Sequence, residues 1–252
     1  MRLVLEIAGS AMINLGLYGH QRDVQAKGQI GRRKAMRSFI GLDLSATEKL
    51  ALDSWRQQAL PEVMPRQWVK SESTRSRKST NARYDNTNSQ GPAQPYAVPA
   101  ANFHITLSFL GEINHRQHEA LVYELDQLVS EPFSLTLDTT GLWNGPKILF
   151  ASPTDAPKAL GELAKLSRKA ARKAAIEVES REYKPHVTLV RKATSSLPLP
   201  LYSPNVDVHV SAFHLFESVS TPQGVVYPIR QSWPLKHNMS VREKLRRGIT
   251  DE

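Results

Sequence analysis

The feature of this chain that most constrains its fold is a short pattern, His-aliphatic-Thr-Leu, that occurs twice. The copies are His104-Ile105-Thr106-Leu107 and His186-Val187-Thr188-Leu189. Both lie among β-branched and aromatic residues, which predicts strands. Because side chains alternate between the two faces of a strand, each histidine shares a face with its threonine, and the aliphatic residues face the core together with Phe103 and Phe109. Each copy therefore presents an imidazole beside a hydroxyl group.

The residue types in the two copies suit chemistry at a phosphodiester. Histidine titrates near neutral pH, so two histidines can divide the roles of general base and general acid. Two threonine hydroxyls can donate hydrogen bonds to the phosphoryl oxygens, where charge stabilisation contributes most. This chemistry needs neither a metal nor another cofactor, and we expect none. A single His-x-Thr arises by chance in many chains, and the structural alternative is a pair of half-buried strand histidines. Two copies, each followed by leucine, favour a phosphate site.

The order of the predicted elements indicates an internal duplication, with one motif strand at the centre of each half. A capping box, Ser45-Ala46-Thr47-Glu48, predicts the start of the first helix, and Asn114 predicts the start of the second. The other expected elements are strands at 36–44, 133–140, 147–151, 206–210 and 225–235, and a third helix at roughly 156–175. The sequence thus predicts an α+β fold: two pseudo-symmetric lobes with facing, antiparallel-rich sheets and outer helices.

Composition divides the chain into one large domain and three irregular segments. Residues 36–236 carry the predicted elements and form the expected bilobal domain. Residues 1–35 have no hydrophobic period and are expected to be a disordered extension or an upstream start, rather than an RNA-binding arm. Residues 70–98 have almost no large aliphatic side chains, which predicts a disordered insertion, with a substrate-gripping flap as the alternative. Residues 237–252 are expected to be a loose charged tail.

Charge and cysteine content limit the partners and the chemistry. The 33 lysines and arginines exceed the 24 acidic residues and give a formal charge of +9, which favours a phosphorylated or polyanionic partner. The cations of residues 165–173 are typical of a solvated helix surface, with an RNA-tracking stripe as the alternative. The absence of cysteine excludes disulfides, thiolate metal sites and a cysteine nucleophile. No apolar run approaches the roughly 18 residues of a membrane span, so we expect a cytoplasmic monomer without membrane contact.

The paired motifs resemble the signature of the two-histidine phosphoesterase superfamily. Flanking residues resemble its RNA 2′,3′-cyclic phosphodiesterase branch, which is also called the 2′–5′ RNA ligase family. The resemblance covers about residues 36–236, and the extension and the insertion depart from it. The flanking residues that carry it are Arg37-Ser38-Phe39-Ile40-Gly41-Leu42, Ser108-Phe109-Leu110-Gly111-Glu112, Pro185, Arg191, Phe216-Glu217-Ser218, Tyr227 and Trp233-Pro234-Leu235.

The resemblance implies a role for each motif residue. His186 would be the proton acceptor that activates water, and His104 would be the proton donor to the departing 3′ oxygen, so that a 2′-phosphomonoester remains. Thr106 and Thr188 would hold the phosphate, and Arg191 would add a cationic donor. Strict alternation would put Arg191 on the face opposite His186, so Arg191 reaches the phosphate only if the strand ends or bulges first.

The expected partner is an RNA or oligonucleotide with a 2′,3′-cyclic phosphate end, which the enzyme would hydrolyse without a metal. Two alternatives share the same pocket. One is a 2′–5′ RNA ligase or a cyclic-nucleotide phosphodiesterase, because the chemistry is common to all of these. The other is a non-catalytic module that binds RNA ends, although two intact histidines argue against it.

Overall fold

A computed structural model describes residues 35–65, 94–222, 224–236, 246 and 248. Contacts divide the chain into Met1–Arg33, which lies outside the described residues, and Lys34–Glu252, to which all of them belong. The predictions for the extension, for most of the insertion and for most of the tail therefore fall outside the described residues. Within the described part of the chain, no helix is long and apolar enough to cross a membrane.

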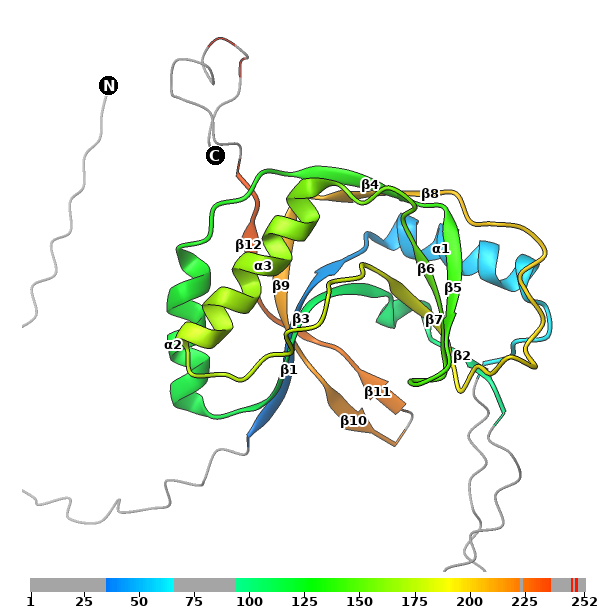
Figure 1. Cartoon of the computed structure of the whole chain (residues 1–252), viewed down its shortest axis with the longest axis horizontal. Helices are drawn as coiled ribbons and strands as arrows, with labels where there is room; N and C mark the ends of the chain where they lie inside the picture. The colour runs from blue at the N-terminus through cyan, green and yellow to red at the C-terminus, as the bar shows by residue number, and fades with distance from the viewer. Residues whose placement is uncertain (1–34, 66–93, 223, 237–245, 247, 249–252) are drawn as a thin grey trace, which may run out of the picture. The chain divides into compact units, whose positions relative to one another are not determined.

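The main sheet has eight antiparallel strands and joins the two halves of the chain (Figure 1). Its order is β12-β9-β1-β3-β7-β6-β5, and β2 pairs with the last two residues of β7, Val190 and Arg191. The strands are β1 (Met36–Asp43), β2 (Tyr96–Ala97), β3 (His104–Ile113), β5 (Thr139–Trp143), β6 (Ile148–Ser152), β7 (Val187–Arg191), β9 (Ala212–Glu217) and β12 (Ile229–Pro234). The motif strands β3 and β7 are the central neighbours, and their register pairs Ile105 with Val187.

Two smaller sheets lie outside this order. In one, β4 (Phe133–Leu137) pairs with β8 (Val206–Val210), and in the other, β10 (Val219–Thr221) and β11 (Gly224–Val226) form a hairpin. The hairpin projects from the end of the sheet near β1 (Figure 1). The prediction of a single final strand at 225–235 is therefore wrong. Its first residues belong to β11, and the pairing with β9 begins only at Ile229.

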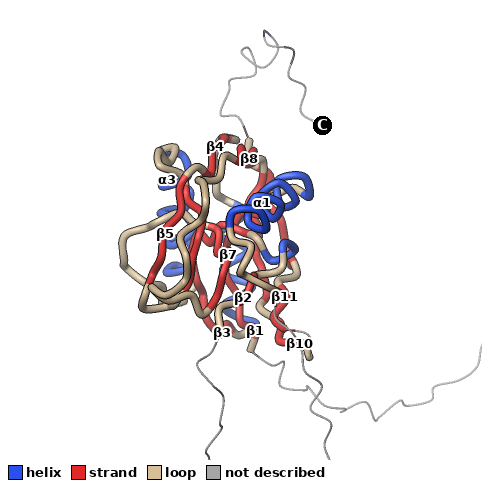
Figure 2. The backbone as a smooth tube through the Cα atoms, turned by 90° about the vertical axis from the view of Figure 1, so that its right-hand side faces the viewer, coloured by secondary structure: helices blue, strands red, loops and turns tan. Residues whose placement is uncertain are grey.

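Among the described residues, three α-helices flank the strands: α1 (Ala46–Ala59), α2 (His115–Asp126) and α3 (Lys158–Lys173). Both predicted helix starts are confirmed, because reciprocal capping bonds join Ser45 to Glu48 and Asn114 to Gln117. Helix α3 packs against α2 and β3, whereas α1 contacts β8 and the short 3-10 helix η1 (Ala100–Asn102). In the view of Figure 2, α1 and α3 lie to either side of the motif strands.

The predicted α+β fold is confirmed, and each half contains the same unit. In the first half, β1 and α1 precede β3, with the short β2 and η1 between α1 and β3, and in the second half β6, α3 and β7 follow one another. In both units, the first strand and the motif strand pair antiparallel. The two halves contribute strands to the same sheet, and they meet at the seam, where β3 pairs with β7 (Figure 1). The motif strands of both units are thus brought side by side.

Both motif strands contain a bulge at the same motif position. On β3, Gly41 faces Thr106 and Ile40 faces Ser108, so Leu107 has no residue opposite it. On β7, Phe150 faces Thr188 and Leu149 faces Val190, so Leu189 has none. A bulge of this kind adds one residue to a strand, so that each residue after the bulge points to the face opposite to the one that strict alternation predicts.

The prediction that Phe109 faces the core is wrong, because the bulge at Leu107 moves it to the other face, where it is 58% exposed. The predicted boundary of the insertion at residue 98 is also too late. Tyr96–Ala97 forms β2, and Ala97 and Val98 are buried. Their small apolar side chains fill the space beside β7, which polar composition upstream did not indicate.

Candidate active site

The four motif residues meet at the seam of β3 and β7. Because these strands are antiparallel with Ile105 opposite Val187, His104 lies across from Thr188 and Thr106 lies across from His186. All four side chains are half-buried, whereas the alternating residues Ile105 and Val187 are fully buried behind them. The two copies therefore form one surface on which each histidine neighbours the threonine of the other copy.

The imidazole of His104 is fixed by its own backbone and by aromatic rings. Its Nδ1 lies 2.7 Å from the carbonyl oxygen of Asn102. A carbonyl can only accept, so Nδ1 carries the proton and Nε2 of the neutral ring keeps its lone pair. The ring packs against Phe39 at 4.7 Å, Phe216 at 5.8 Å and the edge of Tyr227 at 4.9 Å between ring centroids.

His186 repeats this arrangement in the second half. Its Nδ1 lies 2.8 Å from the carbonyl oxygen of Lys184, again two residues earlier in the chain. Its ring meets Trp143 and Phe150 at 4.6 and 5.4 Å between centroids. Both histidines thus hold the same tautomer, with Nε2 as the nitrogen available to a ligand.

Burial lowers the pKa of both histidines. The pKa of His104 falls to about 4, mainly because its aromatic surroundings disfavour the charged ring; the bond to Asn102 opposes this shift, and the charges of Arg191 and His186 add to it. Burial also lowers the pKa of His186, against the opposing effect of the bond to Lys184. At neutral pH both rings are therefore neutral in the free protein.

Arg191 reaches the same face as His186 because of the bulge at Leu189. It follows the bulge by two residues and lines the cleft together with Thr188 and His186. Its Nη2 donates to the hydroxyl of Tyr227 at 3.4 Å. Tyr227 therefore contacts His104 with its ring edge and Arg191 with its oxygen.

The motif strands form one wall of a cleft with a volume of about 1040 Å³. The hairpin of β5 and β6, Arg168 of α3 and the α3–β7 segment (residues 174–186) supply the rest of its lining. Across the described residues, no group of three or more histidines and carboxylates is arranged as a metal site.

Several residues of the site were not expected to take part in it from the sequence. Asn102 and Lys184 act through their carbonyl groups, which any residue type supplies, so no side-chain pattern marks them. Trp143 and Phe150 come from β5 and β6, far from the motif in sequence. The available signals were Phe39, Phe216 and Tyr227, which belonged to the family resemblance without an implied role.

Comparison with known proteins identifies the class. Residues 78–150 match the family model "LigT like Phosphoesterase". The RNA 2′,3′-cyclic phosphodiesterase of Escherichia coli (strain K12) is 30% identical over 138 residues, which are 55% of this chain and 78% of that protein. The protein of the same name from Bacillus subtilis (strain 168) is 34% identical over 129 residues, which are 48% of this chain and 70% of that protein. The chain belongs to the LigT-like family of two-histidine phosphoesterases, as the motifs predicted.

Solved structures agree with this assignment. The crystal structure of E. coli LigT complexed with 3′-AMP superimposes with a TM-score of 0.65 at 25% identity. The match covers 81% of this chain and 100% of that chain.

Proposed function

We propose that this chain hydrolyses the 2′,3′-cyclic phosphate ends of RNA to 2′-phosphomonoesters. The observation that carries the proposal is the pair of histidines on the two adjacent motif strands, each held by a carbonyl at Nδ1 so that its Nε2 keeps a lone pair. Membership of the LigT-like family and two relatives named RNA 2′,3′-cyclic phosphodiesterase support this substrate.

The two histidines take the base and acid roles that the family resemblance implies. Nε2 of His186 accepts a proton from water, whose oxygen forms a bond to phosphorus. The bond from phosphorus to the 3′ oxygen breaks, and the imidazolium form of His104, which has gained a proton at Nε2 from solvent, donates that proton to the oxygen. The products are a 2′-phosphate and a 3′-hydroxyl. Exchange with solvent then returns the proton to His104 and removes it from His186.

The remaining motif residues stabilise charge on the phosphate. The hydroxyls of Thr106 and Thr188 donate to the non-bridging oxygens, and Arg191 supplies a positive charge on the same face. Two imidazoles, two hydroxyls and one guanidinium provide the acid, the base and the charge stabilisation. The reaction therefore proceeds without a metal ion.

We assign the activity to a cytoplasmic monomer. All of the proposed catalytic and phosphate-binding groups come from one chain, so the site needs no second copy. Light scattering coupled to size exclusion should give one chain per particle, and a fractionated cell extract should contain the protein with the cytoplasmic enzymes.

Hydrolysis of a short RNA with a 2′,3′-cyclic phosphate end tests the proposal directly. In excess chelator, phosphorus NMR should show a 2′-phosphomonoester as the main product. His104→Ala and His186→Ala should each lower turnover by about 10²–10⁴, the usual range for general acid–base catalysis. Because both act on one displacement, the double variant should be much less than multiplicatively slower.

Three results would contradict this function. A predominant 3′-phosphate would reverse the placement of the acid. Loss of activity in chelator, restored by a divalent metal, would rule out the metal-independent mechanism. Tight binding of the cyclic end without turnover would identify an RNA-end-binding module instead.

A further inference from the structure

The cleft continues beyond His186 into a region that the four motif residues do not use. Its far part is lined by the α3–β7 segment and by Arg168 of α3. Pockets for ligands of drug-like size, comparable to a single nucleotide, have volumes of roughly 300–1000 Å³, and this cleft has a volume of about 1040 Å³. The cleft is therefore larger than the terminal cyclic phosphate alone requires.

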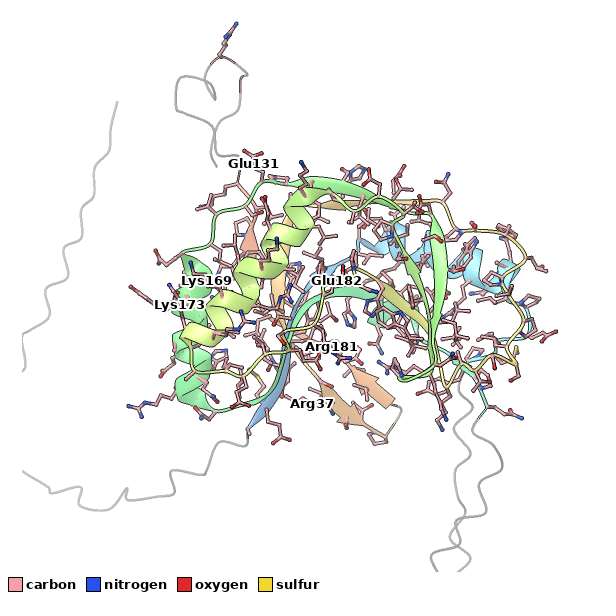
Figure 3. The ribbon with its side chains drawn as sticks, viewed as in Figure 1. Arg37, Glu131, Lys169, Lys173, Arg181 and Glu182 are labelled. Carbon is pink, nitrogen blue, oxygen red and sulfur yellow. The ribbon has the colours of Figure 1, made fainter. Side chains whose placement is uncertain are left out.

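Three cations line this far part: Arg168, Arg181 and Lys184. Figure 3 labels Arg181 on the α3–β7 segment, which runs from the end of α3 back to the motif strand. Lys184 lies two residues before His186, and its carbonyl holds the Nδ1 of that histidine. The cationic region thus begins next to the proposed phosphate site.

The backbone holds Arg168 in place. Its Nη1 donates to the carbonyl oxygen of Arg181 at 2.9 Å, its Nε lies 3.3 Å from the carbonyl oxygen of Ala164, and its guanidinium lies 5.9 Å from the ring centroid of Tyr183. Carbonyl groups do not neutralise a full charge, and in the described part of the chain no carboxylate forms an ion pair with Arg168. Arg168 therefore presents an oriented positive charge to the cleft.

The other two cations are paired only with exposed carboxylates. Arg181 donates to Glu179 through Nε at 3.0 Å and Nη2 at 2.7 Å, and Lys184 lies 3.8 Å from Glu182. Both carboxylates also line the cleft, and all four side chains are at least 60% exposed. Exposed pairs of this kind contribute little to stability. A phosphate can therefore replace the carboxylates, and arginine binds phosphate through two parallel hydrogen bonds.

We propose that Arg168, Arg181 and Lys184 form a second phosphate subsite, which binds the RNA backbone phosphate on the 5′ side of the terminal nucleotide. The ligand class is then an oligoribonucleotide end rather than a cyclic mononucleotide. The subsite extends the proposed function and rests on it, because the cyclic phosphate must lie at the two histidines for the next phosphate to reach these cations.

Three substrates with the same terminal base separate the contributions. They are a cyclic mononucleotide with a free 5′-hydroxyl, the same nucleotide with a 5′-phosphate, and a dinucleotide with the cyclic end. For the wild type, kcat/KM should be at least tenfold higher for the dinucleotide than for the 5′-hydroxyl substrate, and added salt should reduce this ratio. The 5′-phosphorylated nucleotide should have most of the advantage, because it carries the phosphate that the subsite binds.

The variant Arg168→Gln with Arg181→Gln should lower the dinucleotide-to-mononucleotide ratio of kcat/KM at least tenfold. The matched control is Lys169→Gln with Arg172→Gln, which removes two charges from the exposed face of α3 outside the cleft lining. Figure 3 labels Lys169 on that helix. The control should leave the ratio unchanged.

Equilibrium binding separates a failed subsite from a failed function. The affinity for a fluorescent dinucleotide that ends in a 2′-phosphate, followed by anisotropy, needs no turnover and should fall at least tenfold in the Arg168→Gln, Arg181→Gln variant. An unchanged affinity or an unchanged ratio in that variant would overturn the subsite, whatever the activity. If wild-type protein binds this probe through the subsite but hydrolyses none of the three substrates, the proposed function fails and the subsite stands.

Discussion

The neutral state of both histidines sets the expected pH dependence. The active form needs His186 neutral and His104 protonated, whereas the free protein holds the pKa of His104 at about 4 and that of His186 below its ordinary value. Protonated His104 is therefore scarce at neutral pH until an anion binds beside it. A bound phosphate raises the pKa of His104, because an opposite charge favours the charged imidazole.

We therefore expect a bell-shaped profile of kcat/KM whose two limbs both lie below pH 6.5, the ordinary histidine value. The rate falls on the acid side as His186 gains a proton and on the alkaline side as His104 loses one. The profile of kcat, which reports the complex, should be displaced to higher pH. Steady-state rates between pH 4 and 9 check both, and coincident profiles centred above pH 7 would contradict the assignment.

Tyr227 provides a second test at the scale of single residues, because its ring and its hydroxyl contact different groups. Tyr227→Phe keeps the ring against His104 and removes the partner of Arg191. We expect kcat/KM to fall about fivefold, corresponding to about 1 kcal/mol for one hydrogen bond, through KM and with an unchanged pH profile. Tyr227→Leu should also shift the kcat/KM profile to higher pH, since it exposes His104 and relieves the burial that lowers its pKa.

The exposed Tyr123 on α2 supplies the control, and Tyr123→Phe should change neither quantity. Equal pH shifts in Tyr227→Phe and Tyr227→Leu would show that the two contacts of Tyr227 are not separable.

At the scale of elements, the two bulges decide which residues reach the cleft. The pattern of each motif predicted the strand and the shared face of histidine and threonine. It could not predict that Phe109 and Arg191 share this face as well. The reason is physical: a bulge depends on the register against β1 or β6, and these contacts are remote in sequence. β2 was missed for a similar reason, because Tyr96–Ala97 is a strand only through its pairing with β7.

Gly41 lies opposite the first bulge and has no space for a side chain. A Cβ there would lie 2.8 Å from the carbonyl oxygen of Ile105 and 3.3 Å from the ring of Phe216. Gly41→Ala should therefore destabilise the fold by about 1–3 kcal/mol and lower activity, since β3 must shift next to His104. Thermal unfolding and turnover measure the two effects.

Gly161→Ala on α3 is the matched control, because a Cβ there meets nothing within 4 Å. Alanine is the better helix former by about 1 kcal/mol, so this variant should be more stable. A Gly41→Ala protein as stable as the wild type would show that β1 and β3 can separate without cost.

For the molecule as a whole, α1 links the two halves through buried Arg56. This side chain is 5% exposed, and its Nη1 donates to the carbonyl oxygen of Leu189 at 3.2 Å and also to that of Val98. Leu189 is the bulged residue of β7, so a helix of the first half supports the distortion that turns Arg191 toward the cleft.

Arg56→Met should lower the free energy of unfolding by about 1–3 kcal/mol, the cost of leaving a buried acceptor without its partner. It should also weaken substrate binding by loosening the bulge before Arg191. Chemical denaturation and KM report the two effects, and Arg116→Met, at an exposed position of α2, should change neither. Lost stability with an unchanged KM would show that Arg56 stabilises the fold but does not support substrate binding.

The pairing across the seam has a consequence for how such a molecule could arise. Each histidine neighbours the threonine of the other copy, so neither half contains a complete phosphate site. A half-length chain could build the same constellation only as a symmetric pair, with its motif strand against that of an identical partner. Joining the two copies in one polypeptide then freed them to diverge. The second residue after the bulge is aromatic in one copy, Phe109, and cationic in the other, Arg191. A symmetric dimer would have to repeat one residue type on both sides, whereas a single chain with both copies can place a different residue on each side of the cleft.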